Sequence, residues 1–257
     1  MYKIIIALAG YYFFGFFGGL VGYFIGGSID RAKNYGVGGV NPLGTGQRKE
    51  VFFETVFTLM GKLAKADGLI TKDEVEHVEL FIKKMGMTAE HRAQAIAQFK
   101  HGSAVDFEIT EILNTFMAVC GQTLNLKQMV LVYLIVMALA DGKLDKTEIL
   151  LLERIASHLG YSKAEFQQLL EMVLNQSHFG TGQATSTTVL ADAYKALGVA
   201  EKNTDQEIKR AYRKLMSQYH PDKLMGQGLP EDMIAVATEK AKEIQVAYDL
   251  IKQHRGI

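Results

Sequence analysis

The sequence predicts an all-α protein with a single transmembrane helix, a central helical bundle that contains an internal repeat, and a C-terminal helical hairpin. Three observations support this prediction. Residues 4–29 contain no charged side chain, residues 66–86 align with residues 140–160, and two amphipathic stretches flank Pro221 near the C-terminus. We therefore divide the 257 residues into a transmembrane anchor (1–32), a glycine-rich tether (33–49), a helical domain (50–175), a flexible linker (176–188) and a C-terminal domain (189–257).

The composition excludes several classes of protein and site. The 28 Lys and Arg residues balance the 28 Asp and Glu residues, so the overall charge gives no reason to expect a nucleic-acid partner. Cys120 is the single cysteine, which excludes an intramolecular disulfide and a zinc site with several cysteines. We expect Cys120 to be a small buried side chain and the folded parts to suit a reducing compartment.

The uncharged run at residues 4–29 is longer than the ~20 residues that cross the hydrocarbon core as a helix. A cleavable signal peptide is the alternative, but its apolar region spans ~7–15 residues and ends at a small-residue cleavage site. Lys3 precedes the run, and four cations follow it: Arg31, Lys33, Arg48 and Lys49. Because the cytoplasmic flank carries the excess of cations, we expect a single-pass protein with a short external N-terminus and cytoplasmic C-terminal domains.

Glycines recur at four-residue spacing along the predicted transmembrane helix. They are Gly15, Gly18, Gly19, Gly22 and Gly26. Such a stripe allows two helix backbones to approach closely, so we expect self-association into a homodimer within the bilayer. The alternative is that this face meets only lipid, because glycine is common in membrane helices.

The middle region contains two copies of a helix–turn–helix unit. Residues 66–86 and 140–160 each begin with Ala-Asp-Gly and each end with a glycine, Gly86 and Gly160. The Asp-Gly pair breaks one helix, and the following residues begin another.

Capping boxes mark the start of the second helix in both copies. Thr71 pairs with Glu74 in the first copy, and Asp145 pairs with Glu148 in the second, each at the spacing of a reciprocal cap. Residues 129–140 are apolar on every face but too few to span a membrane. This run therefore predicts a central core helix.

The Asp-Gly pattern is similar to the second half of a calcium-binding loop. The positions that would open such a loop lack carboxylates, however, because they are Leu63, Lys65, Met137 and Leu139. We therefore expect no calcium site, and Asp67 and Asp141 to serve as turn residues.

Residues 50–175, with their paired Ala-Asp-Gly units, resemble the TerB-like helical domain of tellurite-resistance proteins. That resemblance implies a link to metal binding. The histidines of this region do not form a cluster at ligand spacing: His77, His91, His101 and His158. We therefore expect no metal site and assign the domain a role in protein interaction.

The C-terminal region predicts three helices. A short helix near residues 189–198 closes at Gly198, and Thr204 with Glu207 forms a capping box that begins the second helix. Pro221 ends that second helix, because proline cannot continue a helix and disfavours helical geometry at the residue before it. The third helix is expected at residues 232–253.

The second of these helices is amphipathic. Its apolar stripe consists of Ile208, Tyr212, Leu215 and Tyr219. Its basic face consists of Lys209, Arg210, Arg213 and Lys214. The apolar stripes of the second and third helices can pack against each other as an antiparallel pair, which leaves residues 220–222 at an exposed bend.

Three stretches together resemble the J-domain of DnaJ-type co-chaperones: residues 193–199, 207–223 and 243–251. The resemblance covers about residues 189–257. It implies that His220, Pro221 and Asp222 bind an ATP-loaded heat-shock chaperone of the DnaK type. The basic face would steer an acidic groove of that partner toward this segment.

Three other interpretations of this region remain open. The basic face could be an ordinary solvated surface, or it could bind nucleic acid, although no base-stacking aromatics accompany it. His220 and Asp222 could form a catalytic dyad, although no nucleophile or metal motif lies nearby. We expect neither a nucleic-acid partner nor a catalytic residue.

The order of the parts resembles the membrane-anchored DnaJ-like co-chaperones of bacteria. This resemblance implies a protein of the cell inner membrane, with a periplasmic N-terminus, that recruits a DnaK-type chaperone and stimulates its ATP hydrolysis. We expect no cofactor and no enzymatic activity of the chain itself. The alternative function is a membrane stress or metal sensor that acts through the TerB-like domain.

Overall fold

The computed structural model describes residues 45–66, 78–83, 85–139, 144–180 and 189–256. The chain divides into two units, Met1–Arg48 and Lys49–Ile257; apart from the first residues of α2, the elements discussed below belong to the second. The expected transmembrane run, its glycine stripe and most of the tether lie outside the described residues. Among the residues that are described, no helix is both long and apolar enough to cross a membrane.

Every described element is helical, as the sequence predicted. The helices of the middle region are α2 (Thr45–Ala64), α4 (Ala89–Gly102), α5 (Ile109–Cys120), α6 (Leu124–Ala138), α7 (Lys146–His158) and α8 (Lys163–Gly180). Two boundaries differ from the sequence prediction. Helix α2 begins inside the expected tether, and α8 extends through the first residues of the expected linker, of which residues 181–188 lie outside the described part.

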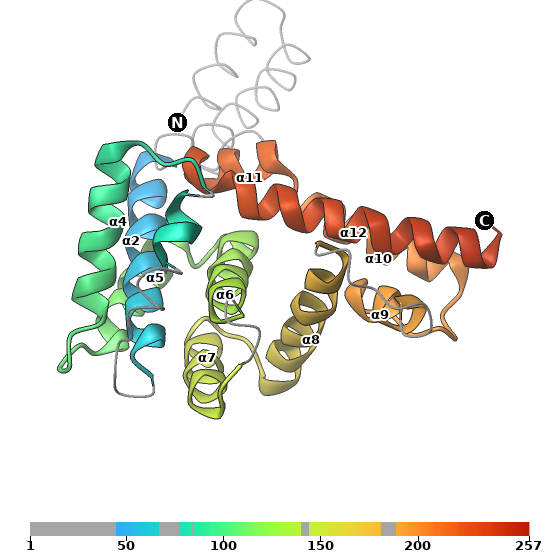
Figure 1. Ribbon diagram of the computed structural model, residues 1–257, viewed down its shortest axis with the longest axis horizontal. Helices are drawn as coiled ribbons and strands as arrows, with labels where there is room; N and C mark the ends of the chain where they lie inside the picture. The colour runs from blue at the N-terminus through green and yellow to red at the C-terminus, as the bar shows by residue number, and fades with distance from the viewer. Residues whose placement is uncertain (1–44, 67–77, 84, 140–143, 181–188, 257) are drawn as a thin grey trace, which may run out of the picture. The chain divides into compact units, whose positions relative to one another are not determined.

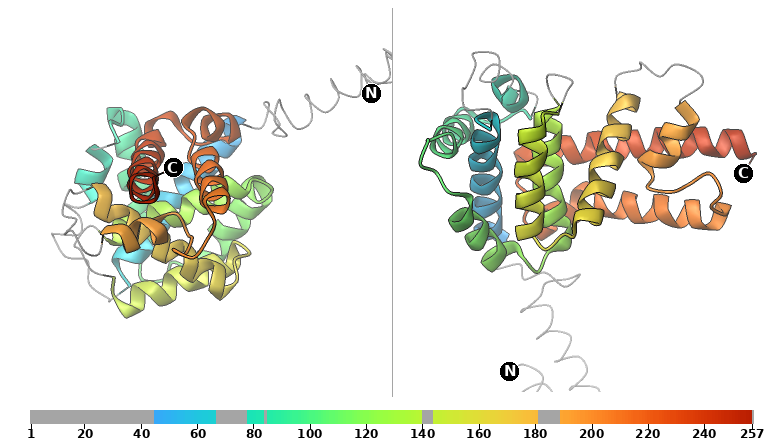
Figure 2. Two further views of the ribbon diagram at one scale, coloured as in Figure 1. Left: turned by 90° about the vertical axis from the view of Figure 1, so that its right-hand side faces the viewer. Right: turned by 90° about the horizontal axis from the view of Figure 1, so that it is seen from below.

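Helix α6 is the core helix that the apolar run predicted. Figures 1 and 2 show it between α2 and α8. Its side chains are buried on nearly every face, and the ring of Tyr133 lies edge-on to that of Phe52 at 5.9 Å between centroids. Cys120 is fully buried at the end of α5, as expected for a small apolar side chain.

Helices α2 and α4 cross in direct backbone contact at two glycines. A Cβ atom added at Gly61 would lie 1.9 Å from the carbonyl oxygen of Phe99, and one added at Gly102 would lie 1.8 Å from that of Thr58. Each glycine therefore faces the backbone of the other helix. Any side chain at either position would force the two helices apart.

The internal repeat is visible in its closing glycines. Gly86 and Gly160 occupy equivalent positions in the two copies, and both have a positive φ, of 70° and 87°. Glycine adopts this left-handed conformation without steric cost, so it is suited to ending a helix. The capping box of Asp145 and Glu148 is confirmed, whereas its counterpart at residues 71–74 lies outside the described part.

The C-terminal region contains α9 (Val189–Ala196), α10 (Asp205–Gln218), α11 (Pro221–Gln227), a short 3-10 helix (Glu231–Met233) and α12 (Ile234–Arg255). Helices α10 and α12 form the expected antiparallel hairpin. The rings of Tyr212 and Tyr248 stack with centroids 4.0 Å apart, and Arg255 near the end of α12 binds Asp205 at the start of α10 with an N–O distance of 2.7 Å. The third helix begins two residues later than predicted, because residues 231–233 form the 3-10 turn.

The C-terminal helices pack against the middle helices. Helices α9 and α12 contact α8, and α11 contacts α6; Figure 2 shows α9 and α12 beside α8 in its right-hand view. Gln176 of α8 donates a buried hydrogen bond to the carbonyl oxygen of Ala196 at 3.0 Å. Residues 49–257 therefore form one unit.

Candidate functional site

The segment His220–Asp222 lies at the turn between α10 and α11. The side chains of His220 and Asp222 are exposed, and Pro221 is half-buried. Pro221 occupies the first turn of α11, where its missing N–H costs no hydrogen bond and its fixed φ suits the helix. The sequence prediction treated this proline only as the end of a helix; in the structure α10 has already ended at Gln218, and Pro221 begins the next helix.

Local hydrogen bonds fix the backbone of this turn. The N–H of Leu224 donates to the carbonyl oxygen of His220 at 3.0 Å, and the N–H of Gly228 donates to that of Leu224 at 3.1 Å. Gly228 has φ of 114° and ends α11, as glycine commonly does. The imidazole of His220 makes no cap hydrogen bond, so it is free of a structural role in starting the helix.

The basic face of α10 lies directly before this turn. All four of its members are exposed: Lys209, Arg210, Arg213 and Lys214. The opposite side of the helix is anchored by the buried side chains of Ile208 and Leu215. The structure therefore places the basic face and the exposed segment 220–222 on one continuous stretch of backbone.

The capping box that begins α10 is present as predicted. The N–H of Thr204 donates to Oε2 of Glu207 at 2.8 Å, and the N–H of Glu207 donates to Oγ1 of Thr204 at 3.3 Å. The first of these bonds, together with one from Asn203, lowers the pKa of Glu207. The carboxylate also complements the positive end of the helix dipole.

Arg255 is a residue of this region that the sequence analysis missed. Its guanidinium donates to Oη of Tyr194 at 2.8 Å and to the carbonyl oxygen of Asn203 at 3.0 Å, in addition to its ion pair with Asp205. It thereby ties α9, α10 and α12 together at the end of the hairpin. These partners lie 50 or more residues away along the chain, so no local pattern could have indicated them.

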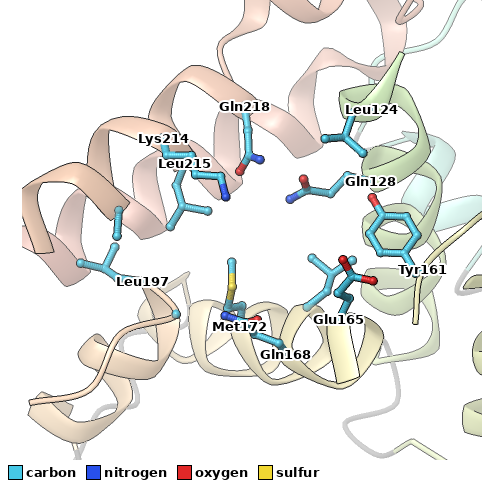
Figure 3. Close-up of a pocket in the computed structure, with 13 residues that line it drawn as sticks. Leu124, Gln128, Tyr161, Glu165, Gln168, Met172, Leu197, Lys214, Leu215 and Gln218 are labelled. Atoms are coloured by element: carbon cyan, nitrogen blue, oxygen red, sulfur yellow. The ribbon is translucent and has the colours of Figure 1, made fainter. Parts of the chain in front are cut away.

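A hollow of about 310 Å³ lies between α6, α8, α10 and the turn that follows α9. Figure 3 shows Gln128, Lys214 and Gln218 extending into it opposite Glu165 and Met172. Tyr161 also lines it, and burial, followed by the nearby Glu165 carboxylate, raises its pKa to about 12. Lys214 therefore belongs to the basic face and also lines this hollow.

The histidines of the middle domain take separate structural positions. His91 contacts Asp232 at 2.5 Å, His101 packs edge-on to Phe107, and Nε2 of His158 is 2.9 Å from Oδ1 of Asn114. Across the described ranges, no three His, Cys, Asp or Glu side chains gather closely enough to hold a metal ion. His77, Asp67 and Asp141 lie outside those ranges.

Two family models match the chain. The model described as "Tellurite resistance protein TerB" matches residues 54–171, and the "DnaJ domain" matches residues 192–255. A protein of Shewanella oneidensis named "Co-chaperone protein DjlA" is 39% identical over 210 residues, which covers 82% of this chain and 80% of that protein. The chain belongs to the DjlA co-chaperone family.

Other members of the DjlA family match over most of their length. The protein of that name from Vibrio cholerae is 37% identical, and the match covers 91% of this chain and 90% of that protein. The one from Photobacterium profundum is 39% identical, and the match covers 95% of this chain and 96% of that protein. No solved structure matches the chain. The expected family resemblance is thus confirmed, and the J-domain match includes the whole segment His220–Asp222.

Proposed function

We propose that this protein is a membrane-anchored co-chaperone that recruits a DnaK-type chaperone through its J-domain and stimulates the ATP hydrolysis of that chaperone. The observation that carries the proposal is the exposed segment His220–Asp222, held between two helices and preceded by the basic face. An exposed, rigid segment can bind a partner with little loss of conformational entropy. The DnaJ family match and the co-chaperone names of its relatives agree with this function.

The basic face serves to steer the chaperone toward this segment. Its four cations lie on one exposed side of α10 and would attract an acidic surface over distances of about 10 Å at moderate salt. Such a contribution acts mainly on the rate of association. The chemistry of ATP hydrolysis belongs to the chaperone.

The membrane anchor is proposed from the uncharged run at residues 4–29. Its length fits one crossing of the bilayer, and the cations after it favour a periplasmic N-terminus with the folded domains in the cytoplasm. The glycine stripe would support a homodimer through the membrane helix. This topology places the J-domain on the side of the membrane where ATP and the chaperone are found.

The function is tested by single-turnover ATP hydrolysis. The full chain, purified in detergent, is added to a DnaK-type chaperone of the same source that has been loaded with ATP. We expect hydrolysis to accelerate with increasing concentration of the protein and to reach saturation. A folded protein that leaves the rate unchanged at every concentration contradicts the proposal.

Charge reversal on the basic face should weaken recruitment. We expect the double variant Lys209→Glu and Arg213→Glu to raise the half-saturating concentration by about tenfold at low salt, because it removes the electrostatic attraction to an acidic partner. The difference should shrink as salt increases. Lys195→Glu with Lys202→Glu is the matched control, because both lysines are exposed and lie off this face; an equal loss in the control would refute specific steering.

A further inference from the structure

Three side chains of α6 contact the J-domain on both sides of the segment His220–Asp222. Nε2 of Gln128 donates to Oη of Tyr219 at 3.2 Å, directly before the segment. Nδ2 of Asn125 donates to Oε1 of Gln227 at 3.0 Å, at the end of α11. The hydroxyl of Tyr133 donates to the carbonyl oxygen of Met233, just beyond that helix.

Two of these three contacts, Gln128 with Tyr219 and Tyr133 with Met233, are buried. Tyr133 and Met233 are 0% exposed, and Tyr219 is 1% exposed. Burial raises the pKa of both tyrosines above the usual range, so both hydroxyls remain protonated; that of Tyr133 donates and that of Tyr219 accepts. A buried polar group that loses its partner keeps its full desolvation cost, so these hydrogen bonds hold the interface in one geometry.

The helix that follows this segment is also held by packing. Leu224 of α11 is fully buried, and α11 packs on both α12 and α6. The imidazole of His220 and the carboxylate of Asp222 remain exposed above this support. Gln128 therefore fixes the chain before the segment, and Asn125 and Tyr133 fix it after the segment. The backbone held in this way sets the direction of the His220 and Asp222 side chains.

We infer that α6 of the TerB-like domain orients the chaperone-binding segment, with Gln128, Asn125 and Tyr133 as positioning residues. The TerB-like domain is then part of the machinery that stimulates the chaperone as well as a surface for other partners. This inference rests on the proposed function. It predicts that a change buried in α6, remote from the exposed surface, lowers the stimulated rate.

The test uses the full chain with Gln128→Leu or Tyr219→Phe, which each remove one partner of the same hydrogen bond and preserve the approximate volume of the side chain. We expect each variant to lower the maximal stimulated rate of single-turnover hydrolysis by about tenfold, because small errors in orientation are costly in rate. The half-saturating concentration should change less than twofold, because the basic face is untouched. The backbone amides of residues 222–228 should also exchange hydrogen faster in both variants.

Thr58→Val is the matched control, because it removes a buried hydroxyl of the middle domain whose hydrogen bond, to Oε1 of Gln98 at 3.2 Å, joins α2 to α4. It should leave the rate and the exchange unchanged. A change in the core can lower the amount of folded protein, so Asn125→Ala provides a further variant. Asn125 is half-buried and contacts the far end of α11 through Gln227. If the wild-type protein stimulates hydrolysis and Gln128→Leu, Tyr219→Phe and Asn125→Ala all keep its rate and its exchange, the inference is overturned and the proposed function still stands. Absence of stimulation by the folded wild-type protein would instead remove the proposed function, and the inference with it.

Discussion

Glutamine in place of His220 should lower the stimulated rate of ATP hydrolysis roughly thirtyfold while leaving the protein folded. His220 is exposed and its imidazole makes no cap hydrogen bond at the start of α11, so its loss removes a partner contact and no internal support. Central contact residues of an interface commonly account for about 2 kcal/mol or more, which corresponds to a loss of roughly thirtyfold in rate. Single-turnover hydrolysis measures the loss, and thermal unfolding measures the integrity of the fold.

His254→Gln is the control for this prediction. His254 is also an exposed histidine of the J-domain, but it lies near the end of α12 at the opposite end of the hairpin. We expect it to retain wild-type stimulation. Stimulation that persists in folded His220→Gln would show that recruitment proceeds through another surface.

Alanine in place of Gly61 should strongly destabilise the middle domain. Its Cβ would lie 1.9 Å from the carbonyl oxygen of Phe99, so α2 and α4 would have to separate along their crossing. Overpacking of this kind costs about 3 kcal/mol, although alanine in an open helical site is favourable. Denaturant unfolding of the full chain measures the change in the free energy of unfolding.

Gly226→Ala is the matched control for the crossing. Gly226 lies in α11, and nothing lies within 4 Å of a Cβ added there. The same substitution should therefore stabilise the protein by about 0.5 kcal/mol through the lower entropy of the unfolded chain. Equal effects of Gly61→Ala and Gly226→Ala would contradict the close backbone contact between α2 and α4.

The sequence allowed the prediction of features that depend on neighbours along the chain. The capping boxes of Asp145 and Thr204 involve residues three positions apart, and both are present. The uniform apolarity of residues 129–140 predicted the core helix α6, because a helix that is apolar on every face has to be surrounded. The antiparallel α10–α12 pair followed from the apolar stripe on each of the two helices.

Features that depend on which helix packs against which could not be predicted in this way. An apolar stripe indicates that a face is buried but does not identify what buries it, so the packing of α11 on α6 was missed. Gln128 and Tyr219 lie 91 residues apart, and Gly61 and Phe99 approach only where two helices cross. The role of Pro221 was missed for a different reason, because proline both ends helices and begins them.

The packing of the J-domain on α6 and α8 has a consequence for dividing this chain. Val173 and Gln176 of α8 are completely covered, and Nε2 of Gln176 donates to the carbonyl oxygen of Ala196. A fragment cut between residues 180 and 189 would expose this apolar surface and the polar groups within it to water. Such newly exposed surfaces promote aggregation, so each half should be less soluble alone than when both halves are co-expressed.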